Sequence, residues 1–173
     1  MKLLLKNSLV LFLIIVIFAC SNSENEKSKD IREDNITKNN HTKIKLNKIG
    51  TNEYDKIIAK EKGKIVIANF YASWCPPCRQ EIPGFINMFN KHKNNLTIIG
   101  LSLDKDAKSA LTFINDMGIN YPVYLANEEL QRKFNIMSIP ISAIYKPDGS
   151  LYNIHFGFLS TTQIEEIIKK LKE

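Results

Sequence analysis

Two cysteines separated by two residues are the side chains of this 173-residue sequence best suited to chemistry. Cys75 and Cys78 form a Cys-Pro-Pro-Cys segment. Such a pair serves either in thiol–disulfide exchange, where one thiolate attacks and the second thiol resolves the mixed disulfide, or as half of a zinc site. A structural zinc site needs four ligands, and the sequence has no second Cys-x-x-Cys and only single, widely separated histidines. The pair therefore predicts redox chemistry without a metal or another cofactor.

The elements that flank the pair favour this interpretation. Residues 64–71 are β-rich and apolar on both faces, which predicts a buried central strand, and residues 76–91 predict a helix. Cys75 would then lie at the helix N-terminus, where unpaired N–H groups and the helix dipole stabilise a thiolate. Pro76 and Pro77 are tolerated in a first helical turn and stiffen it.

The rest of the domain alternates strand and helix patterns. We expect a short edge strand at 43–48, strands at 96–103, 121–125, 141–145 and 151–158, and helices at 52–62, 107–117, 128–134 and 160–171. Gly63 is the expected C-cap glycine of the first helix, Pro83 is expected to kink the helix after the cysteines, and Pro147-Asp148-Gly149 predicts a hairpin turn. The pattern predicts an α/β domain with a mixed sheet covered by helices on both faces.

The N-terminus predicts export. Residues 1–19 combine Lys2 and Lys6 with an uninterrupted apolar run that is shorter than the ~20 residues of a membrane-spanning helix, which is typical of a signal peptide. The residues before Cys20 resemble the lipobox of bacterial lipoproteins, which implies lipidation of Cys20; an uncleaved N-terminal anchor is the alternative. Residues 20–41 are polar and predict a disordered tether, so the folded domain is expected at 42–173.

Charge excludes one class of partner. The net charge of +6 is scattered along the chain without a block of Lys and Arg, which argues against binding of nucleic acid.

Asn69-Phe-Tyr-Ala-Ser-Trp-Cys-Pro-Pro-Cys78 is similar to the active-site strand and turn of the thioredoxin superfamily, and it looks most like the membrane-tethered TlpA/ResA/CcmG group. The position of Pro83, the Ile139-Pro140 pair before a strand and the Gly157-to-Ser160 step before the last helix match the same family, so the resemblance covers roughly residues 42–173. It implies a thioredoxin fold with a strand–helix insertion at about 101–127 and a cis-proline loop at Ile139-Pro140 beside the cysteines.

The resemblance also implies a role for an acid. Thioredoxin has a buried acid on the central strand that accepts a proton during exchange, whereas this chain has Asn69 there, which cannot titrate. Glu81, three residues after Cys78, matches a glutamate of the TlpA/ResA group near the active site. From periodicity alone, Glu81 would be an exposed helix carboxylate. If Glu81 is instead partly buried, its pKa should be raised.

By resemblance, the chain is an extracytoplasmic thiol–disulfide oxidoreductase, attached to the cell envelope through lipid and facing the periplasm. Its site residues would be the nucleophile Cys75, the resolving Cys78, Glu81 and Pro140, with a substrate groove made by Trp74, Pro76, Pro77 and Ile139. Trp74 is expected to pack beside the active site and shield Cys75. The implied partners are disulfide-containing exported proteins and a membrane electron donor, with the protein acting as a monomer and reductively, for example in cytochrome c maturation. The motif itself does not fix the direction of electron flow.

Three other functions remain open at this point. A thiol peroxidase of the same fold would need a single peroxidatic cysteine. A copper chaperone of this superfamily usually has Cys-x-x-x-Cys and a distal histidine. A non-enzymatic surface lipoprotein would only bind a host or envelope partner, and its disulfide would be a structural cross-link.

Overall fold

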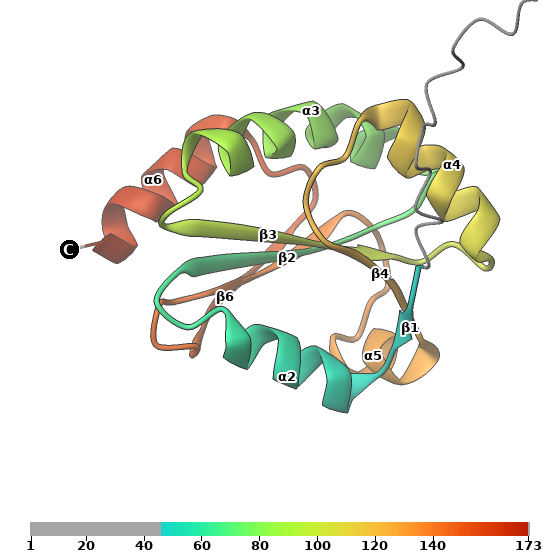
Figure 1. Cartoon of the computed structure of the whole chain (residues 1–173), viewed down its shortest axis with the longest axis horizontal. Coiled ribbons are helices and arrows are strands. Elements are labelled where there is room, and N and C mark those ends of the chain that lie inside the picture. Colours follow the sequence, from blue (N-terminus) through green and yellow to red (C-terminus); the bar gives the residue numbers. More distant parts are fainter. Residues whose placement is uncertain (1–45, 173) are drawn as a thin grey trace, which may run out of the picture. The chain divides into compact units, whose positions relative to one another are not determined.

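The computed structural model describes residues 46–172 (Figure 1). The predicted signal peptide at 1–19, the lipidation site Cys20 and the tether at 20–41 lie outside the described residues, as does the start of the predicted domain. Within the described part, no helix has the length and apolar character needed to cross a membrane.

A six-stranded sheet forms the centre of the domain. The strands are β1 (Lys48–Ile49), β2 (Ile65–Tyr71), β3 (Leu96–Ser102), β4 (Val123–Ala126), β5 (Ile141–Tyr145) and β6 (Leu151–Phe156), in the spatial order β1-β4-β3-β2-β5-β6. The first four strands in this order are parallel, whereas β5 runs antiparallel to both β2 and β6. The predicted mixed sheet is confirmed.

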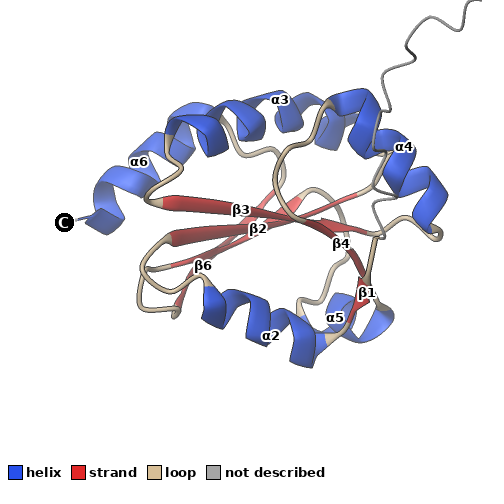
Figure 2. Ribbon diagram, in the orientation of Figure 1, coloured by secondary structure: helices blue, strands red, loops and turns tan. Residues whose placement is uncertain are grey.

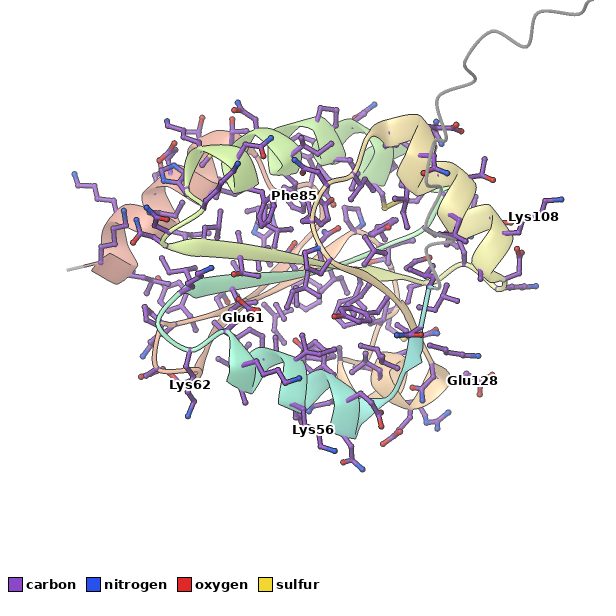
Figure 3. All side chains as sticks on the ribbon, in the orientation of Figure 1. Lys56, Glu61, Lys62, Phe85, Lys108 and Glu128 are labelled. Carbon is purple, nitrogen blue, oxygen red and sulfur yellow. A yellow bond between two sulfur atoms is a disulfide. The ribbon has the colours of Figure 1, made fainter. Side chains whose placement is uncertain are left out.

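Helices cover both faces of this sheet (Figures 1 and 2). One face carries α3 (Pro76–Lys91), α4 (Ala107–Met117) and α6 (Thr161–Lys172), and the other carries α2 (Thr51–Lys60) and α5 (Glu128–Lys133). Figure 3 shows Phe85 pointing from α3 toward the sheet, where it is fully buried, while Lys108 on α4 points away from it. The domain is therefore a three-layer α/β structure with a core on each side of the sheet.

The central strand β2 is buried along its whole length, as its apolar sequence predicts. Because side chains alternate across a strand, Ile65, Ile67 and Tyr71 pack toward the α3 face, whereas Val66 and Ala68 pack toward the α2 face. The residue between Ile67 and Tyr71 in the α3-facing row is polar. That residue is Asn69, and it takes part in the site described below.

The predicted elements are all present, with corrected boundaries. The predicted edge strand at 43–48 is reduced in the described residues to Lys48–Ile49, because only these two residues are in register with Leu125 and Ala126 of the short β4. The last strand ends at Phe156. Helix α2 ends at Lys60 with Glu61 as its C-cap, so Gly63 is not the cap. Instead Gly63, with a φ of 96°, donates its N–H to Pro147 O.

The insertion predicted at about 101–127 comprises the end of β3, helix α4 and strand β4. Strand β4 pairs with β3 on one side and with β1 on the other, so the insertion widens the sheet on the side away from β5. Helix α4 begins at the cap Asp106 and ends at Gly118, which has the left-handed conformation expected after a helix.

Candidate active site

The two cysteines lie where β2 gives way to α3. Cys75 and Cys78 are joined in a disulfide, with their Cα atoms 5.3 Å apart, which confirms the predicted pair. Cys75 is the N-cap of α3, and its sulfur accepts a hydrogen bond of 3.3 Å from the backbone N–H of Cys78. Pro76 and Pro77 occupy the first helical positions. This is the helix N-terminus at which a sulfur anion is stabilised.

The loop before β5 lies against the disulfide. The Ile139–Pro140 peptide bond is cis, as predicted, and Cys75 Sγ lies 3.8 Å from the carbonyl oxygen of Ile139. Pro140 is buried, and its carbonyl oxygen accepts a hydrogen bond from Gly157 N–H in the segment after β6. The structure thus brings Cys75, Cys78, Ile139 and Pro140 together.

Large apolar side chains near this junction are exposed. Trp74, which directly precedes Cys75 in a tight turn, is 68% exposed and so is not closely packed, and the expectation that it shields Cys75 stays a prediction. Phe156, which is 67% exposed, is in register with Ile141, the residue after Pro140. Met137 and Phe158 are also exposed and flank Ile139 and Gly157 in the sequence. The sequence analysis missed Met137, Phe156 and Phe158, because an apolar residue in a strand or loop does not reveal whether it is covered.

Glu81 is buried, and only 1% of it is exposed. The expectation from periodicity, an exposed helix carboxylate, is therefore wrong, and the condition under which its pKa was expected to rise is met. Its two oxygens accept hydrogen bonds from Asn69 Nδ2 at 2.8 Å and from the backbone N–H of Leu159 at 3.1 Å. Burial raises the pKa of Glu81 to about 7, and these two hydrogen bonds moderate the increase.

Asn69 connects Glu81 to the antiparallel side of the sheet. Its Nδ2 also donates a hydrogen bond of 3.1 Å to Ser142 Oγ, on the residue of β5 that is in register with it. Among the described residues, Asn69 Oδ1 has no hydrogen-bond partner although it is buried. The sequence analysis missed Ser142 and the N–H of Leu159, both of which are distant from Glu81 in the chain.

A second polar cluster holds the turn before Cys75. Ser73 donates to Asp104 from its backbone N–H and from its hydroxyl, and its carbonyl oxygen accepts from Arg79 Nη1. Asp104 follows β3 and is 8% exposed. The sequence analysis missed Asp104 and Ser73, since nothing in their spacing links them.

Metal ligands do not gather anywhere in residues 46–172, where no three His, Cys, Asp or Glu side chains are placed to hold an ion. The two described histidines have other neighbours: His92 Nε2 lies 3.0 Å from Glu165 Oε1, and His155 Nε2 lies 3.1 Å from the carbonyl oxygen of Phe158. The chemistry that this site offers is that of the cysteines themselves.

Comparison with known families and curated proteins gives consistent matches. Residues 63–151 match the family described as Thioredoxin-like. The chain is 29% identical over 108 residues to Thioredoxin-like protein YneN of Bacillus subtilis, which covers 61% of this chain and 64% of that protein. It is 30% identical over 122 residues to Thiol-disulfide oxidoreductase ResA of Bacillus anthracis, covering 69% and 70% of the two chains.

Solved structures are similar to the same part of the chain. A thiol:disulfide interchange protein of the thioredoxin family from Chlorobium tepidum is 32% identical with a TM-score of 0.62, covering 66% of this chain and 84% of the other. StoA from Bacillus subtilis is 25% identical with a TM-score of 0.54, covering 61% and 82%.

Proposed function

Since the chain belongs to the thioredoxin-like family and is a thiol–disulfide oxidoreductase of the ResA and StoA type, we propose that it reduces disulfide bonds of other exported proteins. The observation that carries this proposal is the Cys75–Cys78 disulfide at the N-terminus of α3, beside the Ile139-Pro140 loop.

The exchange proceeds in two steps. The Cys75 thiolate attacks one sulfur of the partner's disulfide, forms a mixed disulfide and releases the other partner sulfur as a thiolate. Cys78, after losing its proton, attacks Cys75 Sγ, which forms the Cys75–Cys78 disulfide and releases the second partner sulfur. Two electrons pass to the partner, and a dithiol donor at the membrane must restore the reduced pair.

Cys75 is the nucleophile because it has the helix N-terminus and a backbone N–H to stabilise its thiolate. Cys75 retains 3% exposure, whereas Cys78 has none and lies one turn deeper in α3, where it can reach Cys75 but no large partner. Glu81 lies on the next turn of α3 from Cys78, and its pKa of about 7 suits a group that accepts the Cys78 proton near neutral pH. Asn69 cannot perform this role, because an amide does not titrate.

The groove for the partner chain lies beside Cys75. We assign its walls to Trp74, Pro76 and Pro77 on one side and to Ile139 and Pro140 on the other. The exposed apolar side chains of Phe156 and Met137 extend this surface and support binding of an extended, partly apolar segment.

The location is part of the proposal. The sequence of residues 1–20 supports export and lipid attachment at Cys20, which would hold a monomeric domain on the outer side of a membrane. Partners would then be exported proteins with disulfides, including apocytochromes c during maturation.

Trapping tests this function. In the reduced Cys78→Ser variant, the mixed disulfide on Cys75 cannot be resolved, so exported proteins should accumulate as adducts that dithiothreitol releases. The matched control is the Cys75→Ser, Cys78→Ser double variant, which should capture nothing. Adducts on the double variant, or adducts only in Cys75→Ser, would contradict the assignment. The direction is tested with the wild-type reduction potential, expected below about −200 mV for a reductant.

A further inference from the structure

Ser73 is held at every polar atom. Its backbone N–H lies 3.2 Å from both carboxylate oxygens of Asp104, its hydroxyl donates to Asp104 Oδ1 at 2.7 Å, and its carbonyl oxygen accepts from Arg79 Nη1 at 3.2 Å. The turn is therefore held by side chains outside it, Asp104 and Arg79, as well as by its own backbone hydrogen bond.

Ser73 and Trp74 are the central residues of a tight turn. The backbone N–H of Cys75 donates a hydrogen bond of 3.1 Å to Ala72 O and closes it. Because Trp74 is exposed, Ser73 is the last side chain anchored to the rest of the protein before the cysteine. The position of Cys75 relative to α3 thus depends on how Ser73 is held.

Both groups that hold Ser73 are themselves fixed. Asp104 is 8% exposed, and its Oδ2 also accepts a hydrogen bond of 2.8 Å from Ser102 Oγ at the end of β3. The Arg79 guanidinium lies over the ring of Phe113 in α4, 5.0 Å from the ring centroid. The segment that the sequence analysis identified as an insertion therefore contributes Asp104 and Phe113 to this support.

We propose that Asp104 is a positioning residue for thiol–disulfide exchange, whose carboxylate holds the Ser73 turn so that Cys75 Sγ stays at the N-terminus of α3. This inference rests on the proposed function, in which Cys75 is the attacking thiol. Removal of the carboxylate leaves three donors, the N–H and hydroxyl of Ser73 and the hydroxyl of Ser102, without their acceptor at a largely buried site. The turn must then move to satisfy them, and Cys75 moves with it.

Loss of the Asp104 charge and displacement of Cys75 would change the stability of the Cys75 thiolate in opposite directions, which makes the inference testable. Loss of a nearby negative charge alone stabilises a thiolate, whereas displacement from the helix N-terminus destabilises it. The charged side chains on the neighbouring elements are Arg79 and Glu81 of α3, Asp104 itself, and Asp106, Lys108 and Asp116 of α4 and its cap, which line one hollow with Ser73 and Arg79. The segments 136–140 and 156–160 carry none. A less reactive Cys75 after loss of Asp104 would therefore report position and not charge.

The experiment compares Asp104→Ala with Asp106→Ala in the reduced full-length protein. Asp106 is two residues away, caps α4 through Ser109 and has no hydrogen bond to Ser73, so it is a matched loss of one carboxylate. Rates of iodoacetamide labelling at Cys75 are measured against pH. We expect Asp104→Ala to be at least about threefold slower at neutral pH and to approach wild type at high pH, with Asp106→Ala unchanged.

Two further variants keep the test decisive. Asp104→Asn retains Oδ1, the acceptor of both Ser73 donors, but loses the negative charge, so labelling of Cys75 at neutral pH should be at least as fast as in the wild type. If Asp104→Ala does not fold, Ser73→Ala removes only the hydroxyl bond and should shift the profile in the same direction. Superimposed profiles, faster labelling in Asp104→Ala, or an equal shift in Asp106→Ala would overturn the inference. Failure of the proposed function would appear separately, as Cys78 labelling first in the wild type.

Discussion

The side-chain amide of Asn69 donates a hydrogen bond of 2.8 Å to the carboxylate of Glu81. The two residues come from the central strand and from the helix that follows it, and both are buried. The acid that thioredoxin carries on the strand is thus replaced by an amide, and the carboxylate lies on α3 instead. Burial raises the pKa of this carboxyl to about 7, and the hydrogen bonds from Leu159 N–H and, to a lesser extent, from the Asn69 amide stabilise its charged form and keep the pKa from rising further.

Replacement of Glu81 should change the titration of the second thiol. Glu81→Gln removes a negative charge one helical turn from Cys78, so we expect a lower pKa for the Cys78 thiol in the reduced protein. Ultraviolet absorbance of the thiolate against pH measures this. Glu128→Gln, at an exposed glutamate of α5, is the control and should titrate as wild type. Identical curves for Glu81→Gln and wild type would exclude a role for Glu81 in this step.

The stability of the oxidised protein should depend on pH through the same group. The folded protein holds the Glu81 proton up to a pKa of about 7, against 4.5 for the unfolded chain, so between these values the folded state binds more protons. The free energy of unfolding should therefore fall as pH rises through this window, by about 3 kcal/mol as an upper estimate from the pKa shift. Denaturant titrations from pH 4 to 8 measure it, and Glu81→Gln should lack this component. A wild-type curve that rises over the same range would contradict the sign.

The first thiol to react should be Cys75. In the reduced protein at neutral pH, its sulfur has the N-terminus of α3 and the N–H of Cys78 as stabilising partners, whereas Cys78 is fully buried. Mass spectrometry after brief alkylation should find the label on Cys75 before Cys78. The Cys78→Ser variant should keep the fast reaction, and Cys75→Ser should lose it.

The exposed phenylalanine beside the cis-proline loop should matter for protein partners only. Phe156→Ser removes apolar surface worth ~1–2 kcal/mol in a contact, so KM for a disulfide-containing protein should rise by about tenfold. A small disulfide such as oxidised glutathione should react at the wild-type rate. Leu151→Ser is the matched control, since Leu151 is an exposed residue at the opposite end of the same strand. Equal effects of the two changes would remove Phe156 from the groove.

Elements with strong local patterns could be predicted from the sequence. The continuous apolar run of β2 and the Pro-Pro start of α3 place the cysteines correctly at a strand–helix junction. The Pro147-Asp148-Gly149 turn and the reciprocal hydrogen bonds of Ser160 and Gln163 before α6 also follow from short-range chemistry. Each of these features depends on residues within a few positions of one another.

Features that depend on contacts between distant segments could not be predicted. The exposure of Glu81 depends on the connection between β6 and α6, which covers it through Leu159, 78 residues away. Ser73 and Asp104 are 31 residues apart, and their contact requires β2 and β3 to be adjacent. The length of β1 depends on how far β4 extends beside it. The alternating sequence of residues 43–48 carries no information about the length of β4.

The three residues Gly157, Phe158 and Leu159 join two parts of the site that are otherwise separate. The N–H of Gly157 binds Pro140 O, and the N–H of Leu159 binds the Glu81 carboxylate. This short segment therefore connects the Pro140 loop, at the proposed partner-binding surface, to Glu81, the proposed proton acceptor. Any displacement of this segment that lengthens the Leu159 bond would remove a hydrogen bond that favours the charged carboxylate and would raise the proton affinity of Glu81.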